Sequence, residues 1–163
     1  MPADTKGMLN DPAKVWAMIQ GIDICMFVTR TSGPARGRPM STIPMPSEDA
    51  IYLLTEARSA AAQDVAANGE VLLSYQGGGD HVCVTGTATV DGDTALVKRL
   101  WSTGAQVFWP KGPEASDVVV IRVRPARADY WDGPNPVIGA AQFLFGLVTG
   151  REPDMGERGA AQM

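Results

Sequence analysis

Few residues of this 163-residue chain could carry chemistry on their own, and their spacing excludes several kinds of site. The chain has one histidine, His81, and two cysteines, Cys25 and Cys83, which lie far apart in apolar stretches. A zinc site of His and Cys ligands therefore cannot be assembled in one chain, and we expect no metal. We interpret the cysteines as small buried thiols in a reducing compartment. His81 is either a locally hydrogen-bonded residue or a ligand or base.

The signatures of activated nucleophiles and of phosphate loops are absent from the sequence. There is no G-x-S-x-G segment and no P-loop, and the glycines at 77–79 do not fit G-x-G-x-x-G after a strand. The triple glycine predicts a hairpin loop instead. The acidic pairs Glu48-Asp49 and Asp91/Asp93 fall in expected turns, where carboxylates are solvated. No residue stands out as an obligatory acid or base, so the sequence assigns no catalytic residue.

The elements that must position any site are short strands and a few helices. Asp11 can cap a helix over 11–21 whose first position suits Pro12. Gly69 marks the end of an alanine-rich helix, and Asp91 or Asp93 can cap a later one. The expected helices are 11–21, 58–68, 91–101 and 137–148; the expected strands are 22–29, 38–45, 51–55, 71–75, 81–90 and 117–123.

Strands that follow one another through short loops favour antiparallel pairing. We therefore expect a mainly β fold, a closed or nearly closed antiparallel barrel of six strands with helices packed outside. The length suits one domain over 1–163. Its N-terminal helix would span 11–21, and residues 150–163 would form a loose polar tail.

The composition favours a soluble cytoplasmic protein. Hydrophobic residues make up 45% of the chain, enough for one core, and Gly 18 plus Pro 12 suits short strands and turns. The net charge of -4 gives no electrostatic footprint for nucleic acid or for an anionic membrane. No apolar run reaches the roughly 18 residues of a spanning helix, and the N-terminus lacks the regions of a signal peptide.

A series of segments in order carries more information than any single motif. The segments are Arg38-Pro39-Met40, Leu53-Leu54-Thr55 followed by Ser59 and Asn68, the run 81–88, Leu100-Trp101, the run 109–113 and the run 128–132. Together they closely resemble the pyridoxamine phosphate oxidase-like FMN-binding split-barrel family, in its general stress protein branch. The resemblance covers roughly residues 11–155, nearly the whole chain.

This resemblance implies a six-stranded split barrel that forms a homodimer, with FMN bound in clefts built from both protomers. It implies cofactor-binding positions at Arg38, Pro39, Met40, Leu54, Thr55, Ser59, His81 and Trp131.

The implied roles of these residues differ along the chain. Arg38 matches an arginine that begins the first flavin-binding strand, and its forked donors suit either polar end of a flavin. Leu54 and Thr55 match a pair beside the ring and ribityl groups, and Ser59 matches a serine of the phosphate loop. His81 falls where pyridoxamine phosphate oxidases have a flavin-contacting glutamine. Trp131 matches a tryptophan that reaches the flavin across the dimer. The alternative interpretation is structural: Arg38 is then an arginine on the surface of a strand, and Trp131 covers the core of the dimer.

The chain also departs from the family pattern. Ala61, expected on an exposed helical turn, stands where relatives carry a phosphate-binding lysine, and Ile43 replaces another lysine. Arg36, Arg58 or Arg122 could substitute. The residues just after Trp131, Asp132–Pro136, replace the substrate-binding arginine and histidine of true pyridoxamine phosphate oxidases, so vitamin B6 oxidation is not expected.

Two functions of different classes remain open. The first is a flavin-dependent oxidoreductase whose cofactor passes hydride between an unknown small molecule or reduced nicotinamide and an acceptor. The second is a non-enzymatic, stress-related binding protein of the same fold that holds flavin weakly or takes another ligand. FAD or a deazaflavin is an alternative to FMN in either case.

Overall fold

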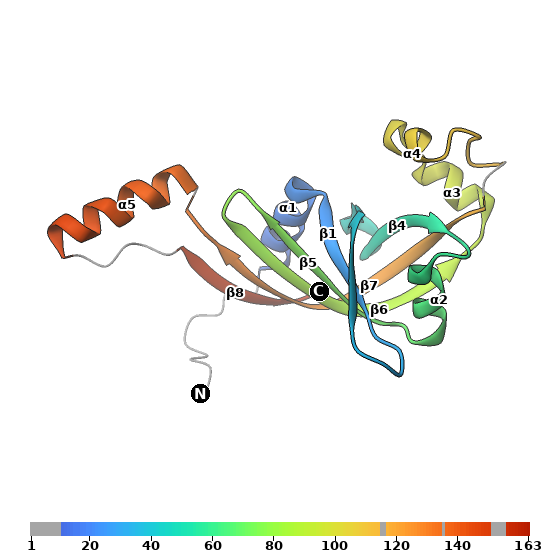
Figure 1. The fold of residues 1–163 in the computed structure, drawn as a ribbon, viewed down its shortest axis with the longest axis horizontal. Helices are drawn as coiled ribbons and strands as arrows, with labels where there is room; N and C mark the ends of the chain where they lie inside the picture. Colours follow the sequence, from blue (N-terminus) through green and yellow to red (C-terminus); the bar gives the residue numbers. More distant parts are fainter. Residues whose placement is uncertain (1–10, 115–116, 135, 151–155) are drawn as a thin grey trace.

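One antiparallel sheet of eight strands forms the centre of the computed structural model, which describes residues 11–114, 117–134, 136–150 and 156–163 (Figure 1). The strands are β1 (Ile24–Thr29), β2 (Arg36–Ser41), β3 (Ile43–Met45), β4 (Ala50–Glu56), β5 (Glu70–Gly77), β6 (Asp80–Asp91), β7 (Val118–Asp132) and β8 (Glu157–Gln162). Seven of them follow the order β2-β1-β5-β6-β7-β4-β3, and β8 pairs with β7. The predicted mainly β, antiparallel fold is confirmed, with eight strands in the described chain rather than six.

Strand β7 is the longest of the described strands and joins the two halves of the sheet. It pairs with β6 along its length, with β4 through its first six residues, and with β8 through its last six. We expected this strand to end at residue 123, the last of the apolar residues Val119, Ile121 and Val123 that alternate along it. The structure carries it to Asp132.

The expected loose tail over 150–163 is wrong for residues 157–162, which form β8. The segment Glu-Arg-Gly-Ala-Ala-Gln lacks the β-branched and aromatic residues that usually mark a strand. Tertiary context decides here: Ala161 is buried in the core, and residues 157–162 pair with residues 127–132 of β7. Residues 151–155 of the expected tail lie outside the described residues.

Two places in the sheet require glycine. The predicted hairpin loop at 77–80 is a tight turn between β5 and β6, in which Gly78 and Gly79 have φ of 63° and 102°. Further along β6, a bulge between Thr85 and Gly86 shifts the register with β7. A Cβ at Gly86 would collide with the carbonyl oxygen of Arg124, so only glycine allows the two backbones to approach this closely.

The main core lies between the sheet and helix α1 (Pro12–Ile22). Asp11 caps this helix by accepting a hydrogen bond from the Lys14 backbone N–H at 3.0 Å, as the sequence predicted. The buried side of α1 packs against apolar residues of β1, β5, β6 and β7. The largest buried side chains of this cluster are Ile19, Phe27, Ile51, Leu53, Leu73, Tyr75, Ile121 and Tyr130.

Three short helices lie at the edges of the sheet. Helix α2 (Ala60–Ala67) is the expected alanine-rich helix, and α3 (Thr94–Leu100) begins after Asp93 rather than Asp91. Helix α4 (Thr103–Phe108) was not predicted. It sits beside α3 at one end of the molecule (Figure 1).

The last described helix, α5 (Pro136–Thr149), has the bounds that the sequence suggested within a residue. It is inserted between β7 and β8 and projects from the end of the sheet opposite α3 and α4 (Figure 1). No helix in the described part of the chain is long and apolar enough to cross a membrane.

Candidate functional site

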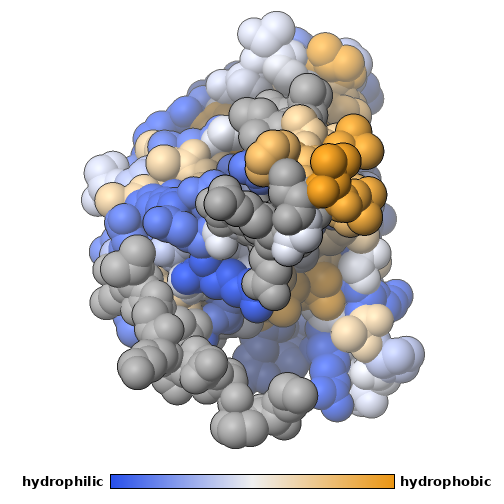
Figure 2. All heavy atoms as spheres, turned by 90° about the vertical axis from the view of Figure 1, so that its left-hand side faces the viewer, coloured by the Kyte–Doolittle hydropathy of each residue, from blue (hydrophilic) through white to orange (hydrophobic). Residues whose placement is uncertain are grey.

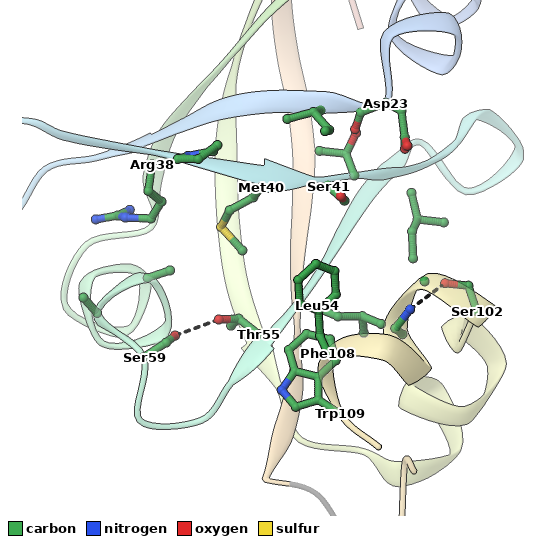
Figure 3. Close-up of a pocket in the computed structure, with 18 residues that line it drawn as sticks. Asp23, Arg38, Met40, Ser41, Leu54, Thr55, Ser59, Ser102, Phe108 and Trp109 are labelled. Atoms are coloured by element: carbon green, nitrogen blue, oxygen red, sulfur yellow. Dashed lines mark hydrogen bonds between the residues drawn. The ribbon is translucent and has the colours of Figure 1, made fainter. Parts of the chain in front are cut away.

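A pocket of about 660 Å³ opens between β2, the end of β4, the start of α2, and α4 (Figure 3). This volume is in the range of sites for cofactor-sized ligands. The pocket is lined by Asp23, Ile24, Arg38, Pro39, Met40, Ser41, Thr42, Ile43, Leu54, Thr55, Ser59, Ala60, Ala61, Ser102, Gly104, Ala105, Phe108 and Trp109.

The structure brings six of the eight sequence-predicted residues together in this pocket. Residues 38–40 come from β2, which lies at one end of the strand order, and Leu54 and Thr55 come from β4 near the other end. Ser59 is the cap of α2, which follows β4 directly. The curvature of the sheet therefore makes a site from strands that do not pair with each other.

The hydroxyl groups of Thr55 and Ser59 form one polar corner of the pocket (Figure 3). Thr55 donates to Ser59 Oγ at 2.9 Å, and the backbone N–H of Ala62 donates to the same oxygen at 3.1 Å. With its oxygen accepting twice, Ser59 has its own O–H left to donate to a ligand. Ala60 and Ala61 at the start of α2 also line the pocket, and the first N–H groups of a helix have no partners within the helix. This corner can therefore hold an anion.

Arg38 is held on the pocket wall by a buried carboxylate that sequence reasoning missed. Its guanidinium donates to Asp64 Oδ2 at 2.9 Å and to Thr29 Oγ1 at 2.9 Å. Asp64 also accepts from Thr29 at 2.7 Å and from Arg36 at 2.7 Å. The side chain of Arg38 is 22% exposed, so it is neither a free surface arginine nor fully buried.

The electrostatics of this network follow from its contacts. The hydroxyl of Thr29 and the guanidinium groups of Arg36 and Arg38 favour the ionised carboxylate, and together they hold the pKa of Asp64 below its usual range, against the opposing effect of burial. Two arginines share one carboxylate, so the cluster keeps a net positive charge. Two of the five N–H groups of Arg38 serve Thr29 and Asp64, and the others can donate into the pocket.

Ala61 lies elsewhere than the sequence suggested. We expected an exposed helical turn, but Ala61 is 3% exposed and lines the pocket. The expectation was wrong because an alanine-rich helix gives no clear apolar face in the sequence. The buried face consists of residues 61, 62, 64 and 65, and its only charged member is Asp64. A longer side chain at position 61 would therefore reach into the pocket from a buried position of the helix, not from an exposed one.

His81 and Trp131 do not line this pocket. They pair in register on β6 and β7, and both are exposed, Trp131 to 40%. Leu54 pairs with Val120 on the same β7 strand, 11 residues before Trp131. At about 3.3 Å per residue, that is roughly 36 Å along the strand. His81 and Trp131 are therefore far along β7 from Leu54. Across the sheet, His81 pairs with Gln76, one residue beyond the Cys25–Tyr75 pair, so the two residues lie nearer to the end of the pocket at Ile24 without lining it.

The pocket also contains residues that the sequence did not point to. Helix α4 contributes a wall with Phe108, and Trp109 follows it (Figure 3). The available signal was Ser102, whose Oγ accepts from the backbone N–H of Ala105 at 3.2 Å and caps the helix. Gly104 in the first turn lowers the helix propensity of this segment, so propensity alone does not predict the helix. Asp23 at the other rim has a φ of 69° and ends α1.

The arrangement suits binding of a flat, largely apolar group with a polar end. Pro39, Met40 and Leu54 supply apolar contacts, and the corner at Ser59 supplies donors. Among the residues that line the pocket, Asp23 and Arg38 are the charged ones. No group of three or more His, Cys, Asp or Glu side chains in the described ranges could hold a metal ion.

The sheet and its flanking helices thus define a mainly β, antiparallel half-barrel of the split-barrel type, with a pocket at its open side. Residues 10–154 match the family described as pyridoxamine 5'-phosphate oxidase like, and the chain belongs to this family. No curated protein matches the chain in sequence.

Solved structures of low sequence identity share the fold. A structure assigned to general stress protein 26 from Jannaschia sp. CCS1 has a TM-score of 0.75 and 21% identity, covering 93% of this chain and 97% of that chain. General stress protein 26 from Bacillus anthracis has a TM-score of 0.64 and 22% identity, covering 72% and 91%. The general stress FMN/FAD binding protein from Xanthomonas citri has a TM-score of 0.64 and 21% identity, covering 72% and 85%.

Proposed function

We propose that the chain binds a flavin of the FMN class in this pocket and acts, as a homodimer, as a flavin-dependent oxidoreductase on a small molecule. The observation that carries the proposal is the convergence of Arg38, Pro39, Met40, Leu54, Thr55 and Ser59 on one cavity of about 660 Å³. The family match and the description of the Xanthomonas citri relative as FMN/FAD binding support the same ligand class.

The residues present fit such a ligand. Pro39, Met40 and Leu54 would hold the ring system, and the corner of Thr55, Ser59 and the α2 backbone would take the phosphate. Arg38 would donate to a polar edge of the flavin. The flavin would supply two-electron redox chemistry, which explains why the pocket needs no obvious acid or base. The protein's own contribution is to bind and orient the cofactor and to keep water away from it.

The homodimer belongs to the same proposal. His81 and Trp131 do not line the pocket of their own chain, and the resemblance implies that Trp131 reaches the ligand of a second copy. A composite site of this kind would explain why an exposed tryptophan is found at the end of a strand. The cytoplasm is the proposed location, since the two cysteines are free thiols.

The second candidate is a stress-related binding protein without redox turnover. Ala61 favours it, because a pocket-lining alanine offers no charge to a phosphate at the position where the family resemblance implies a lysine. Riboflavin, which has no phosphate, would then compete with FMN for the same pocket, and FAD or a deazaflavin is a further alternative.

The test is a titration of the purified protein with FMN, followed by visible absorption, with riboflavin, FAD and a 5-deazaflavin in parallel. Light scattering on the same samples gives the oligomeric state. We expect Arg38→Ala to weaken FMN binding about tenfold, the loss of one charge-assisted contact. The control is Arg124→Ala, which removes an exposed arginine of β7 that does not line the pocket.

The outcomes separate the candidates. Bleaching of bound FMN by NADH or NADPH without oxygen would support the oxidoreductase, whereas binding without bleaching by either nicotinamide would favour the binding protein. Equal affinity of the Arg38→Ala and Arg124→Ala variants would refute the assignment of the pocket. A monomer at micromolar concentration would refute the composite site.

A further inference from the structure

Helix α5 carries apolar side chains that the described residues of the chain leave exposed. None of the residues from Pro136 to Thr149 is charged, and the exposed fractions of Leu144, Leu147 and Val148 are 63%, 69% and 86%. These three residues are spaced three and four apart, so they share one face of the helix. Viewed from this end of the molecule, hydrophobic atoms gather on one part of the surface (Figure 2). Apolar patches of this kind mark interaction sites.

A membrane is a poor occupant for this surface. Fourteen residues of helix span about 21 Å, which is short of the roughly 30 Å core of a bilayer. A helix that lies in the membrane surface usually carries lysine or arginine on its polar face, and α5 has none. A protein surface therefore suits α5 better than a membrane does.

The described residues of the same chain do not cover this face of α5. Within the described chain, no other element packs extensively on α5. The base of α5 is fixed by the β7–β8 ladder, which ends at the pair Asp132–Glu157. This ladder holds the helix at the end of the molecule opposite α3 and α4 (Figure 1).

A second exposed apolar surface lies at that opposite end. Val107 and Phe108 of α4 are 74% and 76% exposed, and Phe108 lines the rim of the pocket. Two apolar surfaces at opposite ends of one chain can meet only between copies. A two-fold axis lets both contacts form at once, α5 of each protomer on α4 of the other.

We propose that α5 of one protomer packs on the rim formed by Val107 and Phe108 of its partner and covers the partner's pocket. The inference rests on the proposed function at one point, the completion of each pocket by Trp131 of a second copy. Because α5 begins five residues after Trp131, a pair that brings Trp131 to the partner's pocket brings α5 to its mouth. The helix then acts as an apolar cover that excludes water from the bound ligand.

Disulfide crosslinking in the full-length chain tests this contact directly. The background is Cys83→Ser, which removes the half-buried thiol and keeps the buried Cys25. Leu147→Cys and Val107→Cys are made separately and together, and each protein is oxidised mildly and run on a non-reducing gel. We expect the double variant to shift from 17.3 kDa to about twice that mass, and neither single variant to do so.

A second measurement does not depend on thiol alignment. Leu144→Glu combined with Leu147→Glu places two charges on the face of α5, and Ala17→Glu combined with Gln20→Glu adds the same charge to exposed positions of α1. Light scattering over a dilution series gives the dimer dissociation constant of each. We expect the dimer dissociation constant of the variant with two glutamates in α5 to be at least tenfold higher than that of the variant with two glutamates in α1.

The results distinguish this inference from the proposed function. Equal dissociation constants for the two glutamate pairs would overturn it, and so would self-crosslinking of Leu147→Cys alone, which would mean that α5 packs on α5. If the wild-type protein binds flavin but the double variant does not crosslink, the cover is wrong and the flavin site stands. If the crosslink forms and no flavin binds, the α5 contact stands and the ligand assignment fails.

Discussion

Replacing Asp64 with asparagine tests how the protein holds Arg38 at the pocket. The buried carboxylate accepts hydrogen bonds from Thr29, Arg36 and Arg38, all between 2.7 and 2.9 Å. Asparagine keeps the shape but loses the charge, and its NH₂ group points a donor at one of these donors. A hydrogen bond to a charged group contributes about 1.5–3 kcal/mol, and a neutral one about 0.5–1.5 kcal/mol.

The three losses do not add, because the side chain of Arg36 is 58% exposed and regains water. We expect the free energy of unfolding to fall by about 2–3 kcal/mol. For a chain of this size, each kcal/mol lowers the melting temperature by about 2–4 °C. The expected decrease is therefore on the order of 5–10 °C in the protein without ligand.

The assay is thermal unfolding by circular dichroism at several pH values. The folded state lowers the pKa of Asp64 below its unfolded value of about 3.9. Its ionisation therefore stabilises the fold above that pH, and the contribution is lost as the pH falls through the folded-state pKa. The gap between wild type and Asp64→Asn should be full at pH 7 and shrink below pH 4.

The matched control is Asp129→Asn, which removes the same charge from an exposed pair with Arg127. An exposed pair of this kind contributes little to stability, so the melting temperature should hardly change. If the two variants have the same melting temperature, or if the difference between wild type and Asp64→Asn does not depend on pH, Asp64 does not stabilise the fold in the way assigned to it.

Three further outcomes follow from the structure. Gly86→Ala should lower the melting temperature by several degrees, because the new Cβ collides with the carbonyl of Arg124. Burial raises the pKa of the Cys25 thiol to about 12, so iodoacetamide at pH 8 should modify Cys83 and leave Cys25 intact, as mass spectrometry would show. Ala61→Lys should lower the melting temperature of the ligand-free protein, yet FMN should raise that of the variant more than riboflavin does. Equal stabilisation by both ligands would mean that position 61 does not face a phosphate.

The parts of the fold predicted from the sequence are those with strong local signals. Asp11 and Pro12 begin α1 as predicted, and the alternation of Val82 and Val84 marks the buried face of β6. Strand β8 lacks such a signal, because it forms by pairing with the distant strand β7. Helix α4 offers only its Ser102 cap, and Gly104 in its first turn lowers its helix propensity.

The residues of the candidate site likewise fall into those that the sequence predicted and those that it did not. The order of segments identified six residues that line the pocket, although β2 and β4 lie near opposite ends of the strand order. Asp64 escaped notice because a single acid in an alanine-rich helix gives no sign of burial. His81 and Trp131 could be assigned to the same ligand from the resemblance, but their separation from the pocket is a property of the folded sheet.

The central position of β7 has a consequence for the order of events during synthesis. Strands β2, β1, β5 and β6 form one half of the sheet and β3 and β4 the other, and β7 is the strand that joins them. A nascent chain that ends before residue 118 contains all six of those strands but not the one between β6 and β4. Since Arg38 lies in one half and Thr55 in the other, the walls of the pocket take their positions only when β7 docks. A growing chain therefore completes the walls of this pocket only late in its synthesis, and partial products lack the finished pocket.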